Sequence, residues 1–197
     1  MKKILLIALL LIPFIGFSQT TKPIDGFLGI KFGTPRAAVI AAIRAKGGKL
    51  SKESTADVLA FTDVRLGQRE TDLFFVRLVN NKVYRAEFTF KPADDYHAIE
   101  YYNNLVTDLN GVYGKGESTK KFTSSFKDGD GHEVGALLIG AAEFYTVWES
   151  STNKNLINAS IDKDDDGTSL VVTLMYEDSA LAELESSQEK KQDKSDF

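Results

Sequence analysis

The chain contains no cysteine and only two histidines among its 197 residues. The absence of cysteine excludes disulfide bonds, thiol nucleophiles, iron–sulfur clusters, cysteine-ligated zinc and lipid attachment at an N-terminal cysteine. The apolar core alone must therefore stabilise the fold. With 43% hydrophobic residues, a chain of this length can bury enough surface for one domain.

Positive charge is also limited, because 24 Lys and Arg face 28 Asp and Glu, for a formal net charge of −4. The sequence shows no basic patch. A mildly acidic chain of this kind is poorly suited to nucleic acid or to anionic membranes. We therefore expect a protein, a glycan or a small ligand as the partner, and no nucleic acid.

Only one long apolar run occurs, from Ile4 to Phe17, and it follows the basic start Met1-Lys2-Lys3. Gly16 and Ser18 provide the small residues that precede a cleavage site. This layout predicts a signal peptide over residues 1–18, with no membrane span after its removal. The mature protein is then periplasmic or secreted in a bacterium, and an uncleaved membrane anchor is the alternative.

The first half of the mature chain predicts one helix followed by strands. Thr34 is expected as the helix N-cap, Pro35 as the first helical residue, and Gly47-Gly48 as the end. Asn80-Asn81 predicts a tight hairpin turn between two strands. An apolar period of two predicts strands over residues 58–66, 71–79 and 83–91. In the last of them Tyr84, Ala86, Phe88 and Phe90 share a face opposite polar residues, which indicates a sheet with one solvated face.

The second half repeats this order. Asp94-Asp95 opens a predicted helix that continues to Tyr113. Residues 134–142 fit either a strand or one or two helical turns. Residues 179–197 are polar and of mixed charge, which predicts a disordered tail. Strands are expected over residues 119–126, 143–149, 155–162 and 168–176.

Segregated helices and strands indicate an α+β fold with a mainly antiparallel sheet and two helices, in the order α-βββ-α-β(β)βββ. We expect a linker over residues 19–26 and a single domain over residues 27–178. The repeated order also suggests an internal duplication, although no residue-by-residue repeat supports it.

Several short motifs resemble those of small exported proteins of Gram-negative bacteria of unassigned function. They are Phe32-Gly-Thr-Pro35, Asn80-Asn81, Tyr113-Gly114, Trp148 and Leu174-Met-Tyr-Glu-Asp178. The layout is also similar, at the level of architecture, to the halves of beta-lactamase inhibitor protein and to the small lipoprotein of the outer-membrane assembly machine. This chain lacks the disulfide cysteines of the first and the lipidation cysteine of the second. The resemblance implies a binding module and carries no residue roles over.

The segment Ile161 to Thr168 (IDKDDDGT) is the strongest candidate for chemistry. Asp162, Asp164 and Asp166 alternate before Gly167, as ligands do in calcium loops. Counted from Asp162, however, Thr173 stands where such a loop needs its bidentate glutamate. Predicted strands flank the segment, and Asp166-Gly167 is a strong hairpin signal. We therefore favour an acidic hairpin tip, with a calcium site at Asp162, Asp164 and Asp166 as the alternative.

Other candidates are weaker. The acidic loop from Asp128 to Glu133 fits a solvated turn, and would bind a cation only if it lay at the same end of the sheet as Asp162. Asp94, His97 and Glu100 share a helix face, which suits either acid–base chemistry or a first turn with acids that favour the helix dipole. No nucleophile elbow, phosphate loop or dinucleotide fingerprint occurs. We predict no catalytic residues and no cofactor, except for the calcium alternative.

These observations favour a non-enzymatic, exported binding or interaction module of the cell envelope. The alternatives are a calcium-stabilised form of the same domain and a hydrolase assembled from scattered carboxylates. Exposed tyrosines or Trp148 would provide a recognition surface, although most aromatic residues are expected in the core.

Overall fold

The computed structural model describes residues 21–123 and 125–195, so the predicted signal peptide lies outside the described residues. The first half contains β1 (Gly26–Phe27), β2 (Ile30–Lys31), α1 (Arg36–Ala45), β3 (Lys49–Leu50), β4 (Val58–Thr62), β5 (Arg65–Leu66), β6 (Arg69–Glu70), β7 (Leu73–Val79) and β8 (Lys82–Phe90). The second half contains a 3₁₀ turn (Asp95–His97), α2 (Ala98–Tyr113), β9 (Glu117–Phe122), α3 (Glu133–Leu138), β10 (Ala142–Glu149), β11 (Leu156–Lys163), β12 (Leu170–Glu177) and α4 (Ser179–Ser195).

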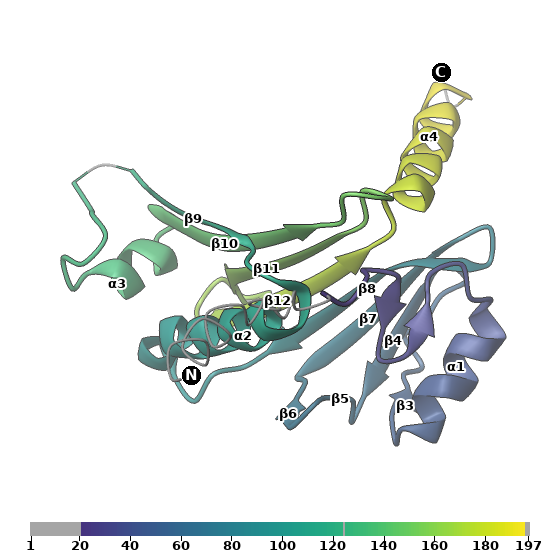
Figure 1. The fold of residues 1–197 in the computed structure, drawn as a ribbon, viewed down its shortest axis with the longest axis horizontal. Helices are drawn as coiled ribbons and strands as arrows, with labels where there is room; N and C mark the ends of the chain where they lie inside the picture. Colours follow the sequence, from purple (N-terminus) through teal and green to yellow (C-terminus); the bar gives the residue numbers. More distant parts are fainter. Residues whose placement is uncertain (1–20, 124, 196–197) are drawn as a thin grey trace, which may run out of the picture.

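Eight of the strands form one antiparallel sheet in the order β3-β4-β7-β8-β12-β11-β10-β9 (Figure 1). This confirms the predicted α+β class with a mainly antiparallel sheet. The prediction of two helices was wrong, because the described part of the chain contains four α-helices. None of the described helices is long and apolar enough to cross a membrane.

The two halves have related layouts. Each contains a helix, α1 or α2, that is followed by four strands of the main sheet, which run as a meander toward its middle. In the first half the short β1–β2 hairpin precedes α1. The last strands of the halves, β8 and β12, pair antiparallel at the centre. The small β5–β6 hairpin interrupts the first meander, and α3 interrupts the second.

One face of the sheet carries the core. Phe74 and Phe88 stack there with ring centroids 4.4 Å apart, and Tyr176 contacts Phe88 edge to face across the β8–β12 pair. Helix α1 buries Val39 and Ile43 in the same core, and α2 buries Tyr102, Leu105 and Leu109. The alternation of apolar residues along β8 thus places its apolar side chains under the helices, as the period of two predicts.

A β-bulge in β8 moves Tyr84 out of the predicted pattern. The β7–β8 hairpin turns at Asn80 and Asn81, which both have positive φ, as the sequence predicts. The register then shifts between Arg77 and Leu78, so that Leu78 faces Val83 and Tyr84 is the extra residue. Tyr84 is buried outside the main core, near Glu185 of α4.

Local contacts explain the other differences from the predicted elements. Thr34 does not cap α1: its hydroxyl donates to the Lys31 carbonyl at 2.7 Å, and Pro35 holds the N-cap position in an extended conformation. The segment 134–142 is helical as far as Leu138. The predicted disordered tail is largely helix α4, which Asp178 caps by accepting a hydrogen bond from the Leu181 N–H at 2.9 Å. Ile24, within the predicted linker, is buried in the core.

Candidate functional site

The acidic segment is the tip of a hairpin between β11 and β12, as the flanking strand patterns and Asp166-Gly167 predict. The loop is longer than a two-residue turn at Asp166-Gly167. It closes where the Asp164 N–H donates to the Ser169 carbonyl at 2.9 Å, and Gly167 has φ +69°. The Asp164 carboxylate accepts hydrogen bonds from the Thr168 and Ser169 N–H groups at 2.8 and 3.1 Å. These bonds lower the pKa of Asp164 below its ordinary value.

The three aspartates do not converge on one point. Asp162 accepts a hydrogen bond from the Ser160 hydroxyl at 2.6 Å, Asp164 is engaged by the loop backbone, and Asp166 is exposed. Within residues 21–123 and 125–195, no three His, Asp or Glu side chains are grouped to hold a metal ion. Calcium binding at Asp162, Asp164 and Asp166 therefore stays a prediction.

The second acidic loop lies at the same end of the sheet, since it follows β9 and precedes β10. Its carboxylates also bond to their own loop. Asp130 accepts from the Lys127 and His132 N–H groups at 2.9 and 2.8 Å, and these bonds lower the pKa of Asp130. This loop has the hydrogen bonding of a self-contained turn.

Asp94 and His97 form the start of the α2 region. The Asp94 carboxylate accepts from the His97 N–H at 3.1 Å and lies 2.8 Å from His97 Nδ1. The contact with His97 lowers the pKa of Asp94. This is the geometry of an N-cap in the first turn. Tyr96 is 82% exposed beside it.

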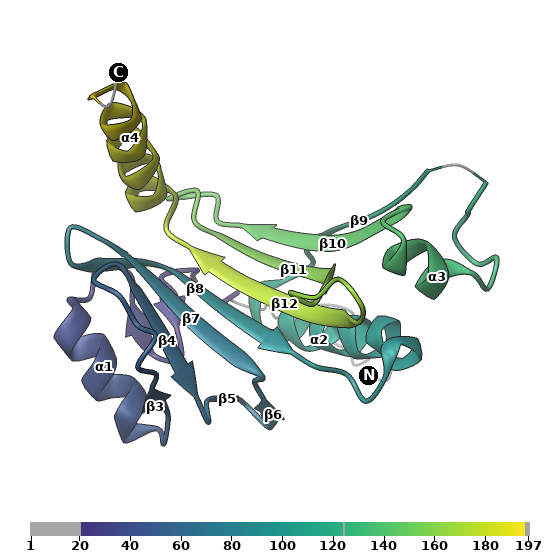
Figure 2. The same ribbon diagram turned by 180° about the vertical axis from the view of Figure 1, so that it is seen from behind.

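The sheet face opposite the core is a further candidate binding surface, and it extends over more of the molecule than the acidic loops or the start of α2. Figures 1 and 2 show α1 and α2 on the core side of the sheet, and α4 beside one end of β12. Two rows of this face follow from the strand registers. One row is Ala60, Phe75, Glu87, Met175, Asn158, Val147 and Glu117; the other is Leu73, Thr89, Thr173, Ser160, Tyr145 and Thr119. The face therefore mixes apolar side chains with hydroxyls and carboxylates.

A trough of about 410 Å³ crosses this open face over β7, β8, β12 and β11. We call it the open-face trough. Its apolar floor includes Leu73, Phe75, Val171 and Met175, of which Val171 is buried and the other three are half-buried. The carboxylates of Asp72, Asp162, Asp164 and Asp165 and the ammonium of Lys163 also line the trough. A fifth carboxylate, that of Glu87, lies within the floor between Phe75 and Met175. The trough thus combines apolar side chains with an excess of carboxylates, one of which, Glu87, lies between the apolar groups of β7 and β12.

The trough was not predicted from the sequence, although two apolar runs indicate it. Leu73-Phe-Phe-Val76 and Leu170-Val-Val172 are apolar at consecutive positions. Because neighbouring residues of a strand point to opposite faces, such runs place apolar groups on both sides of the sheet. The acids that line the trough come from separate segments, so only the fold brings them together.

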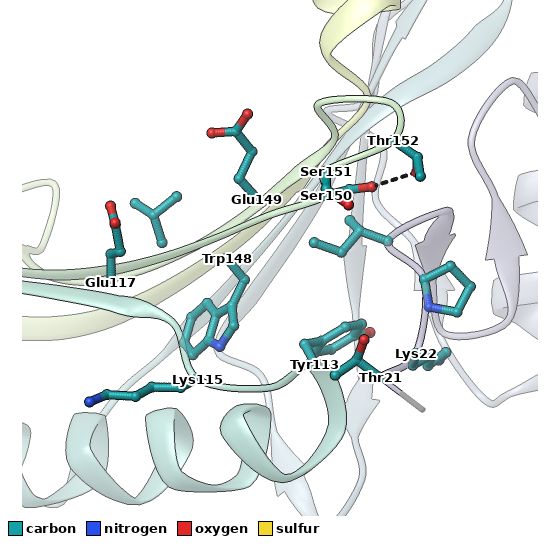
Figure 3. A pocket seen from close by; sticks show the side chains of 13 residues that line it. Thr21, Lys22, Tyr113, Lys115, Glu117, Trp148, Glu149, Ser150, Ser151 and Thr152 are labelled. Carbon is teal, nitrogen blue, oxygen red and sulfur yellow. Dashed lines mark hydrogen bonds between the residues drawn. The ribbon is translucent and has the colours of Figure 1, made fainter. Parts of the chain in front are cut away.

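A second hollow, of about 520 Å³, lies where β10 extends past the start of β9 (Figure 3). Trp148 and Tyr113 form its aromatic wall, and Lys22, Lys115 and Glu149 contribute charge. The Trp148 indole N–H donates to Asn110 Oδ1 at 3.1 Å and to the Gly114 carbonyl at 3.0 Å. The indole is only 4% exposed, so it is held as a structural wall and offers little surface to a ligand.

Buried polar groups serve the fold. Thr146 and Asn155 are the buried polar residues of the described chain. Thr146 Oγ1 lies 2.6 Å from the Tyr102 hydroxyl and 2.9 Å from the Ser118 hydroxyl, which links α2, β10 and β9. No carboxylate within the described residues is buried, so the hydrolase alternative gains no support from a buried acid pair.

Comparison with known proteins gives no relatives: no family model, no curated protein and no solved structure matches the chain.

Proposed function

We propose that this chain is a non-enzymatic binding module of the bacterial cell envelope, exported by its N-terminal segment. The open-face trough is its binding surface. The ligand is a basic, partly apolar segment of another polypeptide. The observation that carries the proposal is the combination of four apolar side chains (Leu73, Phe75, Val171 and Met175) with five carboxylates that lie among and around them.

The chemistry of the trough supports this ligand class. Apolar side chains that gather on a solvated sheet face offer contact surface to a partner. Glu87 lies directly between Phe75 and Met175 in one row of the sheet, so charge and apolar surface alternate over a few ångströms. A segment that alternates lysine or arginine with apolar residues complements both features.

The related layout of the halves supports a duplicated ancestor. The trough draws on both halves, with β7 and β8 from the first and β12 and β11 from the second. We infer that the duplication produced the trough when the two meanders joined at the β8–β12 pair.

Calorimetric titration with synthetic peptides tests the proposal. A peptide that alternates leucine with lysine should bind, whereas a matched peptide that alternates leucine with glutamate should not. Glu87→Lys should weaken binding of the lysine peptide by about tenfold or more, since one contact worth about 1.4 kcal/mol accounts for a factor of ten.

The matched control is Glu53→Lys, which makes the same change of net charge at an exposed residue outside the trough. This variant should bind the lysine peptide like the unaltered protein. Equal binding of both peptides, or equal losses in the two variants, would show that the trough is not the binding surface.

A further inference from the structure

Strand β9 leaves a long open edge on the sheet. It is the last strand and pairs with β10 alone. Its six residues are exposed or half-buried. At the opposite edge β3 has only two residues and lies against α1, so little backbone is open there. An unpaired edge presents a row of N–H and C=O groups that another strand can bind.

The hydrogen bonds of β9 define which of its backbone groups face outward. The Thr123 N–H donates to the Ala141 carbonyl at 2.8 Å, just beyond the end of the strand. Bonding to a neighbouring antiparallel strand alternates along the chain, so Glu117, Thr119 and Lys121 bond to β10. Ser118, Lys120 and Phe122 therefore direct their N–H and C=O groups away from the sheet. No other described segment forms a backbone hydrogen bond to them.

We propose that β9 pairs antiparallel with β9 of a second copy of this chain, with the two-fold axis at Thr119, so that two sheets join into one. In this register Glu117 of each copy lies opposite Lys121 of the other. Both side chains are on the open face of the sheet, because Glu117 pairs with Val147 and Lys121 with Glu143. Ser118 lies opposite Lys120 of the other copy, and these two residues exchange the outward N–H and C=O bonds.

The charges of β9 select this register. A two-fold pairing that keeps both core faces on the same side must be centred on a residue. Centring on Lys120 places Lys120 against Lys120. Centring on Ser118 leaves Glu117 opposite threonine and Lys121 opposite Lys115. Like charges directly opposite destabilise a strand pair, and opposite charges stabilise it. Of these three pairings in the middle of β9, only the one centred on Thr119 forms two acid–base pairs.

The same lysines also explain why the partner is a second copy. Lysine on an edge strand disfavours pairing with strands that lack a matching acid. In this structure Lys121 lies 3.7 Å from Glu143 and Lys120 lies 2.7 Å from Asp128. Both lysines are solvent-exposed, so Lys121 can turn to a second Glu117. One strand pair buries little surface, so we expect a weak, reversible dimer.

Cysteine cross-linking tests the register directly, because the chain has no cysteine of its own. Facing residues of a pair without mutual hydrogen bonds have Cα atoms about 4.5 Å apart, within the range that a disulfide spans. Under mild oxidation, Thr119→Cys should form a covalent dimer about tenfold faster than Ser118→Cys or Lys120→Cys. Those two exposed variants control for random collision. Equal rates for all three would overturn the proposal.

Sedimentation of the purified protein tests the charge pairs. Glu117→Lys and Lys121→Glu should each abolish the dimer, and the double variant should restore it. Lys120→Pro removes an outward N–H and leaves the bonds to β10 in place. This variant should sediment as a monomer, and its circular dichroism should show that it is still folded. A wild-type protein that stays monomeric at high concentration contradicts the proposal. None of these measurements depends on a ligand in the open-face trough.

Discussion

Asp164 stabilises the β11–β12 hairpin through two hydrogen bonds from the loop backbone. These bonds favour the ionised carboxylate, so the pKa of Asp164 is lower in the folded than in the unfolded chain. Its contribution to stability is therefore present above the unfolded pKa, about 3.9, and is lost as the pH falls through the folded pKa. Asp164→Ala should destabilise the protein at pH 7 and have a smaller effect at a pH below the folded pKa, where the carboxylate is protonated in both states.

Urea unfolding of the two proteins at both pH values measures this difference. Asp166→Ala is the matched control, because Asp166 lies exposed at the same tip and should leave the midpoint unchanged at either pH. The same unfolding measurement also tests whether calcium binds at the hairpin tip. The destabilisation from Asp164→Ala should be the same with and without calcium. Stabilisation by millimolar calcium of the wild type alone would support a metal site instead.

Asn155 has a structural role that the sequence does not predict. Its side chain is buried and donates to the Ile24 carbonyl at 3.0 Å, while its Oδ1 accepts from the Ser179 N–H at 3.3 Å. One amide thus joins the N-terminal segment, the β10–β11 turn and the start of α4. The sequence predicts only an ordinary polar residue in a turn there, because its partners are more than twenty residues away. The hairpin tip at Asp164 was predictable because its turn chemistry is local.

At the scale of elements, helix α4 shields the bulge in β8. Burial, followed by the nearby Glu185 carboxylate, raises the pKa of Tyr84 to about 12. A chain that ends at Asp178 lacks this cover, so the pKa of Tyr84 should fall toward the usual tyrosine value of about 10. The pKa of Tyr84 can be measured from the phenolate absorbance of the truncated protein during a pH titration. Subtracting the titration of the truncated Tyr84→Phe variant isolates the signal of Tyr84 from those of the other tyrosines. An unchanged titration would mean that the bulge alone buries Tyr84.

The long periodic elements were predictable and the short ones were not. The strands around Asn80-Asn81 and helix α2 follow from apolar period and turn residues. The β5–β6 hairpin and α3 are too short for a period to show. Helix α4 was misread because polar composition suggests disorder, whereas Asp178 provides a cap and Ala180, Leu181, Ala182 and Leu184 favour helix. Tyr84 lies off the predicted face because a bulge reverses the alternation.

At the scale of the whole molecule, the halves share one core across the β8–β12 pair. Phe88 contacts Phe74 of its own half and Tyr176 of the other, and Phe27 also packs against Phe88. Because this cluster belongs to both meanders, neither half has a complete core without the other. We therefore expect one cooperative unfolding transition for the whole domain.

Native-state hydrogen exchange tests this cooperativity. The amides of β8 and β12 have strands on both sides and a buried face, so they should exchange only through global unfolding. The amides of β3 and β9 lie at the edges and should exchange faster. Phe88→Ala should cost about 3–5 kcal/mol and lower the protection of β8 and β12 by equal amounts, since the cavity weakens both halves. If β10–β12 kept their protection while β4–β8 lost it, the halves would be separate folding units, and the β8–β12 pair would be only a contact between them.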